Sequence, residues 1–296
     1  MLIWREREHE EVDEAAILHL PTQRALKACC LYKFWAISGM RAQVELLTWL
    51  VDRWHVEDQC FFIGGHRLEI ELEDIYFLTG LSKRGEHVSL FGTRPGGQTV
   101  TSLQLEFCND QANPRDKRID IKHIIRPELK VIAFTVTKLC GSVALHVATG
   151  SHMRIAVDCF RGTIFNWCEA VLANIKGQLT RAKTGKLKNF GYGSIVVSFA
   201  LERIPQLAPQ SISVDAGQLR EPRMVRWSAL MARHAIEGAE IVRFPASYFH
   251  WLERQVFMIE DFPYAGIDFR GDREMSLPAG EQWEIQVKHF STFAKF

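Results

Sequence analysis

The stretch FFIGGHRLEIELEDIYFLTGLSKRG, Phe61 to Gly85, decides the expected fold of the N-terminal part of the chain. Its apolar run stops at Gly64-Gly65, and a segment of alternating apolar and charged residues follows. Alternation places every second side chain on the same face of a strand, and two adjacent glycines supply the positive φ angles of a tight hairpin turn. The pattern therefore predicts two strands, residues 59–63 and 66–72, joined as a β-hairpin.

A short helix is expected to follow this hairpin. Glu73 and Asp74 fall in its first turn, where carboxylates complement the exposed N–H groups and the helix dipole. Leu78 belongs to its apolar face, and Gly80 suits the left-handed residue that ends a helix. Glu71 occupies the N-cap position, where Ser, Thr, Asp or Asn would be favoured.

The same stretch crowds carboxylates beside a histidine, which raises the alternative of a metal or acid/base site. Strand alternation puts Glu69 and Glu71 opposite the apolar face of the second strand, and so toward water. A two-carboxylate hydrolase or a divalent-metal site needs such groups to converge in a pocket. Because acidic first turns are common in helices, we favour the hairpin and helix over the catalytic alternative.

Apolar residues at helical spacing predict most of the remaining elements. Residues 90–113 are rich in Gly, Thr, Gln and Asn and indicate a loop with at most one short helix, and 206–222 indicate a linker. A short strand is expected at 283–287. The expected helices are residues 40–54, a stripe from Leu129 to Val147 after Pro127, a stripe from Phe160 to Ile175, and residues 191–204, 224–234 and 245–259. The predicted fold class is mainly α, a helical domain with a short N-terminal β-hairpin leading into a helix.

Composition and charge are those of a soluble globular protein. The 296 residues are 47% hydrophobic and 24% charged with a formal net charge of +1, so any attraction to nucleic acid must come from a local patch. The seven cysteines form no Cys-x-x-Cys pair, which favours buried reduced thiols. We expect no signal peptide and no membrane segment. The expected organisation is an acidic lead-in, 1–20, and one globular domain, 21–296.

The residues from about 31 to 92 show an ordered set of motifs. An apolar helix ends in Val-Asp-Arg-Trp, a hairpin follows, and then comes Leu-Glu-Asp-x-x-x-Leu-x-Gly-Leu. In this order the chain resembles the plant mobile domain family. GYGSIVVSFALERIP and the Trp-containing helix at 223–234 sit where that family has comparable pieces, whereas Glu71 stands where the family often has a Thr helix cap. The matching motif residues are Asp52, Arg53, Trp54, Leu72, Glu73, Asp74, Leu78, Gly80 and Leu81.

The resemblance implies a nuclear role. The family comprises domains of plant transposable elements and of host proteins related to MAINTENANCE OF MERISTEMS. Those host proteins are linked to transposon silencing, gene expression and meristem maintenance, and some copies are joined to, or act with, PPP-type serine/threonine phosphatases. A protein partner of that type is therefore expected. The choice between a host regulator and a transposon-encoded copy stays open.

The family also bears the label "aminotransferase-like", which the residues do not support. Pyridoxal phosphate chemistry needs a Schiff-base lysine within a phosphate-binding site, and Lys83 is the single lysine in a suggestive loop. A transposase nuclease needs carboxylates on adjacent strands, but Asp52, Asp74 and Asp158 fall in helical contexts. We therefore expect no cofactor, no metal and no catalytic residues. A hydrolase or transposase remnant using Glu73 and Asp74 remains the alternative.

One basic segment is a candidate nucleic-acid site. No acidic residue lies between Glu169 and Glu202, and two aromatic residues follow the cations. Cations beside exposed aromatic rings can hold phosphates and stack bases. Because the segment is short, we favour the alternative of a solvated loop between two helices. The residues of the segment are Lys176, Arg181, Lys183, Lys186, Lys188, Phe190 and Tyr192.

The function expected from the sequence is that of a non-catalytic interaction module. Its large aromatic residues, most of which belong in the core, could supply interface anchors where they reach the surface. The candidates are Trp4, Trp35, Trp227, Trp251 and Phe257.

Overall fold

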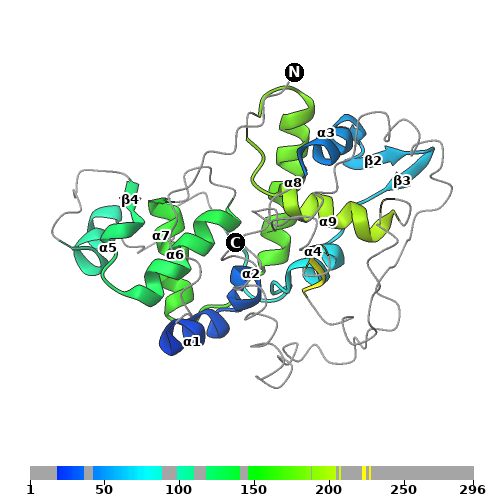
Figure 1. Ribbon diagram of the computed structural model, residues 1–296. Coiled ribbons are helices and arrows are strands. Elements are labelled where there is room, and N and C mark those ends of the chain that lie inside the picture. Colours follow the sequence, from blue (N-terminus) through cyan, green and yellow to red (C-terminus); the bar gives the residue numbers. More distant parts are fainter. Residues whose placement is uncertain are drawn as a thin grey trace, which may run out of the picture.

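The computed structural model describes residues 19–36, 43–88, 99–109, 118–140, 146–187 and 189–204, with 207, 222–224 and 227. Within these ranges helices predominate, and two small antiparallel sheets accompany them (Figure 1). The predicted fold class is therefore confirmed. None of the helices in these ranges combines the length and the apolar character needed to cross a membrane. The division into residues 1–20 and 21–296 stays an expectation.

The predicted hairpin is present. Strands β2 (Cys60–Ile63) and β3 (His66–Leu68) run antiparallel, with Ile63 opposite His66. Gly64 and Gly65 have φ angles of 58° and 84°, the left-handed conformation that a two-residue hairpin turn requires. The second strand stops at Leu68, four residues before the predicted end, because the chain turns there to enter the next helix. The sequence also gave no sign of β1 (Trp54–His55), which pairs with the other edge of β2.

The inner face of this sheet is a row of large apolar side chains. The strand register aligns Trp54 with Phe61 and Phe61 with Leu68, and all three are buried. The ring of Phe61 lies 4.9 Å from that of Trp54 and 6.0 Å from that of Phe199. The helices that pack together on this side of the molecule are α3 (Val44–Asp52), α4 (Leu72–Thr79), α8 (Trp167–Lys183) and α9 (Gly193–Arg203).

A second group of helices surrounds α6, which packs against α7 and α1. Figure 1 shows this group on the left and the three-stranded sheet with its helices on the right. The two groups share one continuous hydrophobic core. The elements of the α6 group are α1 (Leu20–Ala28), α2 (Tyr32–Ala36), α5 (Val100–Phe107), β4 (Arg118–Asp120), the 3-10 helix η1 (Ile121–His123), α6 (Pro127–Leu139), β5 (Val147–Thr149) and α7 (Gly150–Phe160).

Two predicted apolar stripes span breaks in the helices. The stripe from Phe160 to Ile175 covers the end of α7 and the start of α8, with Gly162 at a φ of 96° between them. Ile164 lies in that break and is 38% exposed. The stripe that begins after Pro127 leaves its helix at Leu139, and Val147 belongs to β5. Apolar spacing alone does not show where the backbone leaves the helix.

Other predictions have mixed outcomes. Helix α9 confirms the expected helix at 191–204, and α5 is the short helix allowed within 90–113. The expected helix at 40–54 is shorter, since α3 ends at Asp52 and Trp54 enters a strand. All seven cysteines are free thiols, five of them buried. The predicted linker, the last two helices and the last strand lie outside the described residues, with the exception of 207, 222–224 and 227.

Candidate functional site

The Leu-Glu-Asp motif forms helix α4 as predicted. Glu71 is its N-cap, and its backbone N–H donates to the Asp74 carboxylate at 2.8 Å. Gly80 ends the helix with a φ of 66°, and both Leu78 and Leu81 are fully buried. Leu72 is half-buried against the same core. This motif is thus a packing element, whose sequence sets where a short helix begins and ends.

Asp74 does more than complement the helix N-terminus. Its side chain is 1% exposed and forms an ion pair with Arg203 on α9, with 3.1 Å between Oδ1 and Nε. Arg203 is itself 6% exposed, and its guanidinium lies over the Phe199 ring at 5.8 Å. The predicted first-turn position of Asp74 is correct, but its ion pair with Arg203 was not predicted, because that partner lies 129 residues further along the chain.

Glu202, next to Arg203, belongs to a second buried polar cluster. Arg223 donates from Nε to Glu202 at 2.8 Å, and the Trp227 indole N–H donates to the other carboxylate oxygen at 2.9 Å. All three residues are buried. The end of α9 therefore ties the α4 motif on one side to Arg223 and Trp227 on the other.

The chain after Gly80 docks on the segment that opens α8. Cys168 donates its backbone N–H to Ser82 at 3.0 Å, and Glu86 exchanges backbone hydrogen bonds of 2.9 and 2.8 Å with Ile164 and Asn166. Gly85 has a φ of 112°, and a Cβ there would lie 2.3 Å from the Ile164 carbonyl oxygen. Only a glycine allows the two backbones to approach so closely. The Lys83 ammonium lies over the Tyr76 ring at 4.9 Å.

The Asp-Arg-Trp motif joins α3 to the sheet. Trp54 is 2% exposed, and its indole N–H donates to Thr180 on α8 at 3.2 Å. The Arg53 guanidinium lies 4.7 Å above the Trp49 ring, while its carbonyl accepts from Phe62 at 3.0 Å. Asp52 is exposed. The motif thus orients α3, β1 and α8 relative to one another.

The basic segment brings three exposed cations together at the C-terminal end of α8. Arg181, Lys183 and Lys186 are exposed, whereas Lys176 is half-buried and lies two turns before Lys183. Lys183 donates from Nζ to the Asp52 carbonyl at 2.6 Å, which holds it against the end of α3. Lys188 lies outside the described residues. Phosphate binding by this segment stays a prediction.

The aromatic residues expected beside these cations are not at the surface. Tyr192 is 2% exposed, and its hydroxyl donates to the Leu139 carbonyl at the end of α6. Burial raises the pKa of Tyr192 well above its usual range. Phe190 is half-buried against the core. We therefore correct the expectation that Tyr192 offers an exposed ring for base stacking.

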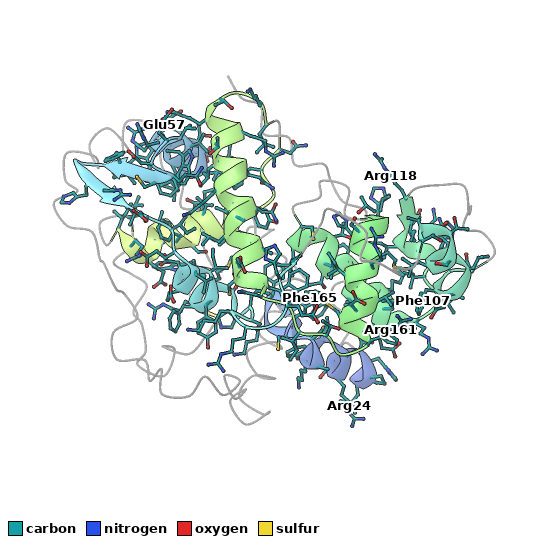
Figure 2. All side chains as sticks on the ribbon, turned by 180° about the vertical axis from the view of Figure 1, so that it is seen from behind. Arg24, Glu57, Phe107, Arg118, Arg161 and Phe165 are labelled. Atoms are coloured by element: carbon teal, nitrogen blue, oxygen red, sulfur yellow. The ribbon has the colours of Figure 1, made fainter. Side chains whose placement is uncertain are left out.

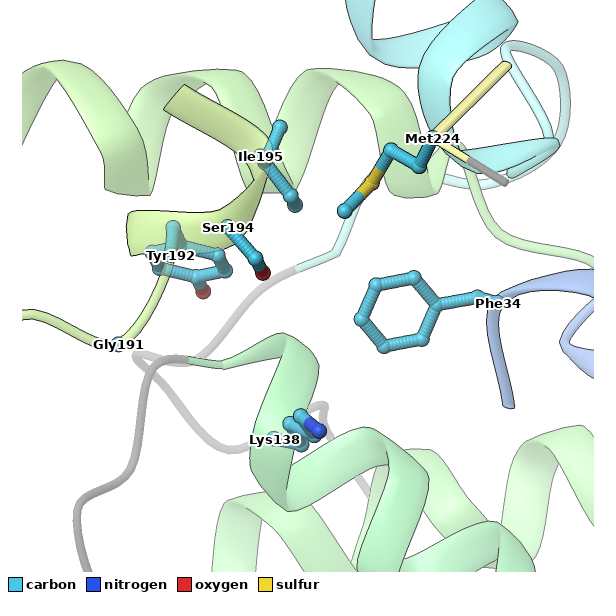
Figure 3. Close-up of a pocket in the computed structure, with 7 residues that line it drawn as sticks. All are labelled: Phe34, Lys138, Gly191, Tyr192, Ser194, Ile195 and Met224. Carbon is cyan, nitrogen blue, oxygen red and sulfur yellow. The ribbon is translucent and has the colours of Figure 1, made fainter. Parts of the chain in front are cut away.

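A small pocket lies beside Tyr192, between the two helical groups (Figure 3). Its cavity volume is about 20 Å³. That is room for little more than a water molecule and is far below the roughly 300–1,000 Å³ of small-molecule sites. Its lining residues are Phe34, Lys138, Gly191, Tyr192, Ser194, Ile195 and Met224. Within the described ranges no group of three or more His, Cys, Asp or Glu residues is arranged to hold a metal ion.

A single family model covers helix α4, the Asp-Arg-Trp turn and the polar end of α9. The family model described as "Plant mobile domain" matches residues 31–252, most of the chain. The chain belongs to the plant mobile domain family. The match continues well beyond the residues that carry the resemblance in the sequence, and it includes the Glu202, Arg203 and Arg223 cluster of this plant mobile domain. No curated protein and no solved structure shows a significant match to the chain.

Sequence reasoning missed the residues that link the plant mobile domain's elements. Glu202 and Arg203 are apparent only as the charged end of an apolar helix, and Arg223 as one of several arginines near a tryptophan. The one available signal was the position of two charged residues at the end of an otherwise apolar run. Buried charges are expected to be paired, so such a run predicts partners without naming them.

Proposed function

We propose that this plant mobile domain is a nuclear interaction module without enzymatic activity. It would act in transposon silencing, gene-expression control and meristem maintenance through protein partners. The observation that carries the proposal is a set of large apolar side chains at the surface. Leu105 is 73% exposed, Ile125 is 62% exposed and Phe62 is 42% exposed. Large apolar side chains exposed to solvent offer contact area to a protein partner.

The tryptophans named as candidate anchors do not provide this surface. Trp227 is buried and Trp35 is half-buried, while Trp4, Trp251 and Phe257 lie outside the described residues. Among the described residues, Phe62 is the aromatic side chain with a large exposed fraction. The interface anchors of this proposal are therefore mostly aliphatic.

The partner class that we propose is a PPP-type serine/threonine phosphatase. Support for this choice comes from the family, some of whose copies are joined to such enzymes or act with them. A noncatalytic domain of this kind would position the phosphatase or its substrate. The proposed location is the nucleus.

The rival hydrolase would need Glu73 and Asp74 as free carboxylates. Asp74 is held by Arg203 and by the Glu71 N–H, so its charge is already compensated. Replacing Asp74 would therefore damage the fold and could not separate the two hypotheses. Glu73→Gln is the cleaner test, since it removes the other carboxylate and leaves the ion pair intact.

The experiment mixes residues 1–296 with a nuclear PPP-type phosphatase and follows both by gel filtration. Co-elution by the wild type and by Glu73→Gln is the expected result. A chain that elutes alone and turns over a small substrate, with that activity lost in Glu73→Gln, would replace the interaction module with the hydrolase.

A further inference from the structure

The α6 group of helices is strongly basic, although the whole chain is nearly neutral. Its described residues, 19–36, 99–109, 118–140 and 146–161, contain ten Lys and Arg against four Asp and Glu, a net charge of +6 with His neutral. Residues 43–88 contain four Lys and Arg against nine Asp and Glu, a net charge of −5. The formal net charge of +1 conceals this division. A surface of one charge sign favours partners of the other sign.

Three segments of the basic group meet at one place, which we call the α5–α6–α7 junction. It consists of the end of α5 (105–107), the chain leading into α6 (123–126) and the end of α7 (160–161). Ile125 donates its backbone N–H to Phe107 at 2.9 Å, which joins the first two segments. Arg161 pairs with Glu106 at 3.2 Å, which joins the third. Figure 2 shows Phe107 and Arg161 close together on this group of helices.

The junction carries the two most exposed large apolar side chains in the described part of the protein. Leu105, on the last turn of α5, is 73% exposed and Ile125 is 62% exposed. Leu105 lies two residues before Phe107, whose carbonyl accepts from the Ile125 N–H, so the two exposed residues come from neighbouring segments. Isolated exposed aliphatic residues are ordinary, but two on one junction offer contact area to a partner.

Arginines held over aromatic rings flank these apolar residues. The Arg126 guanidinium lies 5.7 Å from the Phe160 ring centre, and that of Arg161 lies 5.9 Å from the Phe107 ring centre. Arg126 is exposed, and no carboxylate among the described residues pairs with it. A guanidinium held in place by stacking is well suited to a bidentate carboxylate contact.

We propose that the α5–α6–α7 junction is the docking surface for an acidic protein segment. The segment would place apolar side chains on Leu105 and Ile125 and a carboxylate on Arg126. This inference rests on the proposed function and names the surface that performs it. A protein suits the surface better than a nucleic acid does, because single-stranded nucleic acids stack their bases on exposed aromatic rings. Here the exposed residues are aliphatic, and Phe107 is 6% exposed.

The test measures the fluorescence anisotropy of a labelled peptide in which leucines alternate with pairs of glutamates. The full chain should bind it, and Arg126→Glu or Ile125→Ser should each weaken binding by roughly tenfold or more. Two matched controls lie outside the junction. Arg24→Glu makes the same charge reversal at an exposed arginine on α1, and Val44→Ser removes a 40% exposed apolar residue from α3. Both should bind like the wild type.

Several outcomes would overturn the docking surface. The surface is wrong if the acidic peptide does not bind, or if Arg126→Glu and Ile125→Ser leave its affinity unchanged. It is also wrong if a single-stranded oligonucleotide binds more tightly through the same residues. Self-association that disappears in Arg126→Glu would make a second copy the occupant instead. Circular dichroism and thermal unfolding of each variant must match the wild type, which separates lost contacts from lost structure. If Arg126→Glu binds the phosphatase as tightly as the wild type does, this surface is wrong although the interaction module stands.

Discussion

The buried ion pair between Asp74 and Arg203 offers the sharpest test of how this plant mobile domain is held together. Asp74→Asn removes one charge while keeping the size of the side chain and an oxygen that can accept from the Glu71 N–H. Arg203 would then be left buried and without its counter-charge. The substitution therefore probes the charge pair and spares the helix cap.

The expected loss is large because both partners are shielded from water. The side chains of Arg203 and Asp74 are 6% and 1% exposed, with 3.1 Å between Nε and Oδ1. Removing one member of such a pair costs about 3–5 kcal/mol of unfolding free energy. For a chain of this size that corresponds to a fall in Tm of roughly 6–20 °C.

Thermal unfolding followed by circular dichroism measures this loss. The matched control is Glu69→Gln, which breaks the surface pair with Arg67, whose side chains are 39% and 57% exposed. That variant should lose less than about 1 kcal/mol. In a double-mutant cycle, the unfolding free energies lost by Asp74→Asn and by Arg203→Met are added and compared with the loss in the double variant. The double variant should lose less than that sum, by at least about 1 kcal/mol. An Asp74→Asn protein that melts like the wild type, or a cycle without coupling, would refute the reasoning.

Further predictions concern the motif helix, a buried histidine and the basic segment. Leu78→Ala should cost about 2–5 kcal/mol in urea unfolding, because the side chain is fully buried. Gly80→Val should clearly lower Tm, because a β-branched residue resists a φ of 66°; an unchanged Tm would contradict this. Burial lowers the pKa of His152 below its ordinary 6.5, so the unfolded state gains the proton first and stability should fall as pH drops below that value. His152→Gln should flatten this dependence in urea midpoints measured between neutral pH and about pH 5. If the end of α8 binds nucleic acid, affinity should fall steeply with salt and vanish when Lys183 and Lys186 become Glu; binding indifferent to both would exclude this surface.

The sequence predicts best those features whose causes are local. Gly64-Gly65 supplies the backbone angles of the hairpin by itself, and Gly80 ends the helix four residues after Tyr76, whose carbonyl accepts its N–H at 2.8 Å. Leu78 follows from the spacing of apolar residues within one helix. None of these depends on a distant partner.

Features that depend on distant residues could not be predicted. Asp74 looked like an ordinary first-turn carboxylate because Arg203 lies 129 residues away. Tyr192 looked exposed beside lysines, but its hydroxyl reaches the end of α6. The Leu105 and Ile125 surface also depends on the pairing of α5 with the chain before α6, which no periodicity reveals.

The central claim is that this plant mobile domain acts by binding a protein partner. Isothermal titration of a nuclear PPP-type phosphatase into residues 1–296 tests it most directly. The prediction is saturable binding with a defined stoichiometry, weakened by roughly tenfold or more in Arg126→Glu and unchanged in Arg24→Glu. The absence of any saturable heat, together with separate elution of the two proteins on gel filtration, would contradict it.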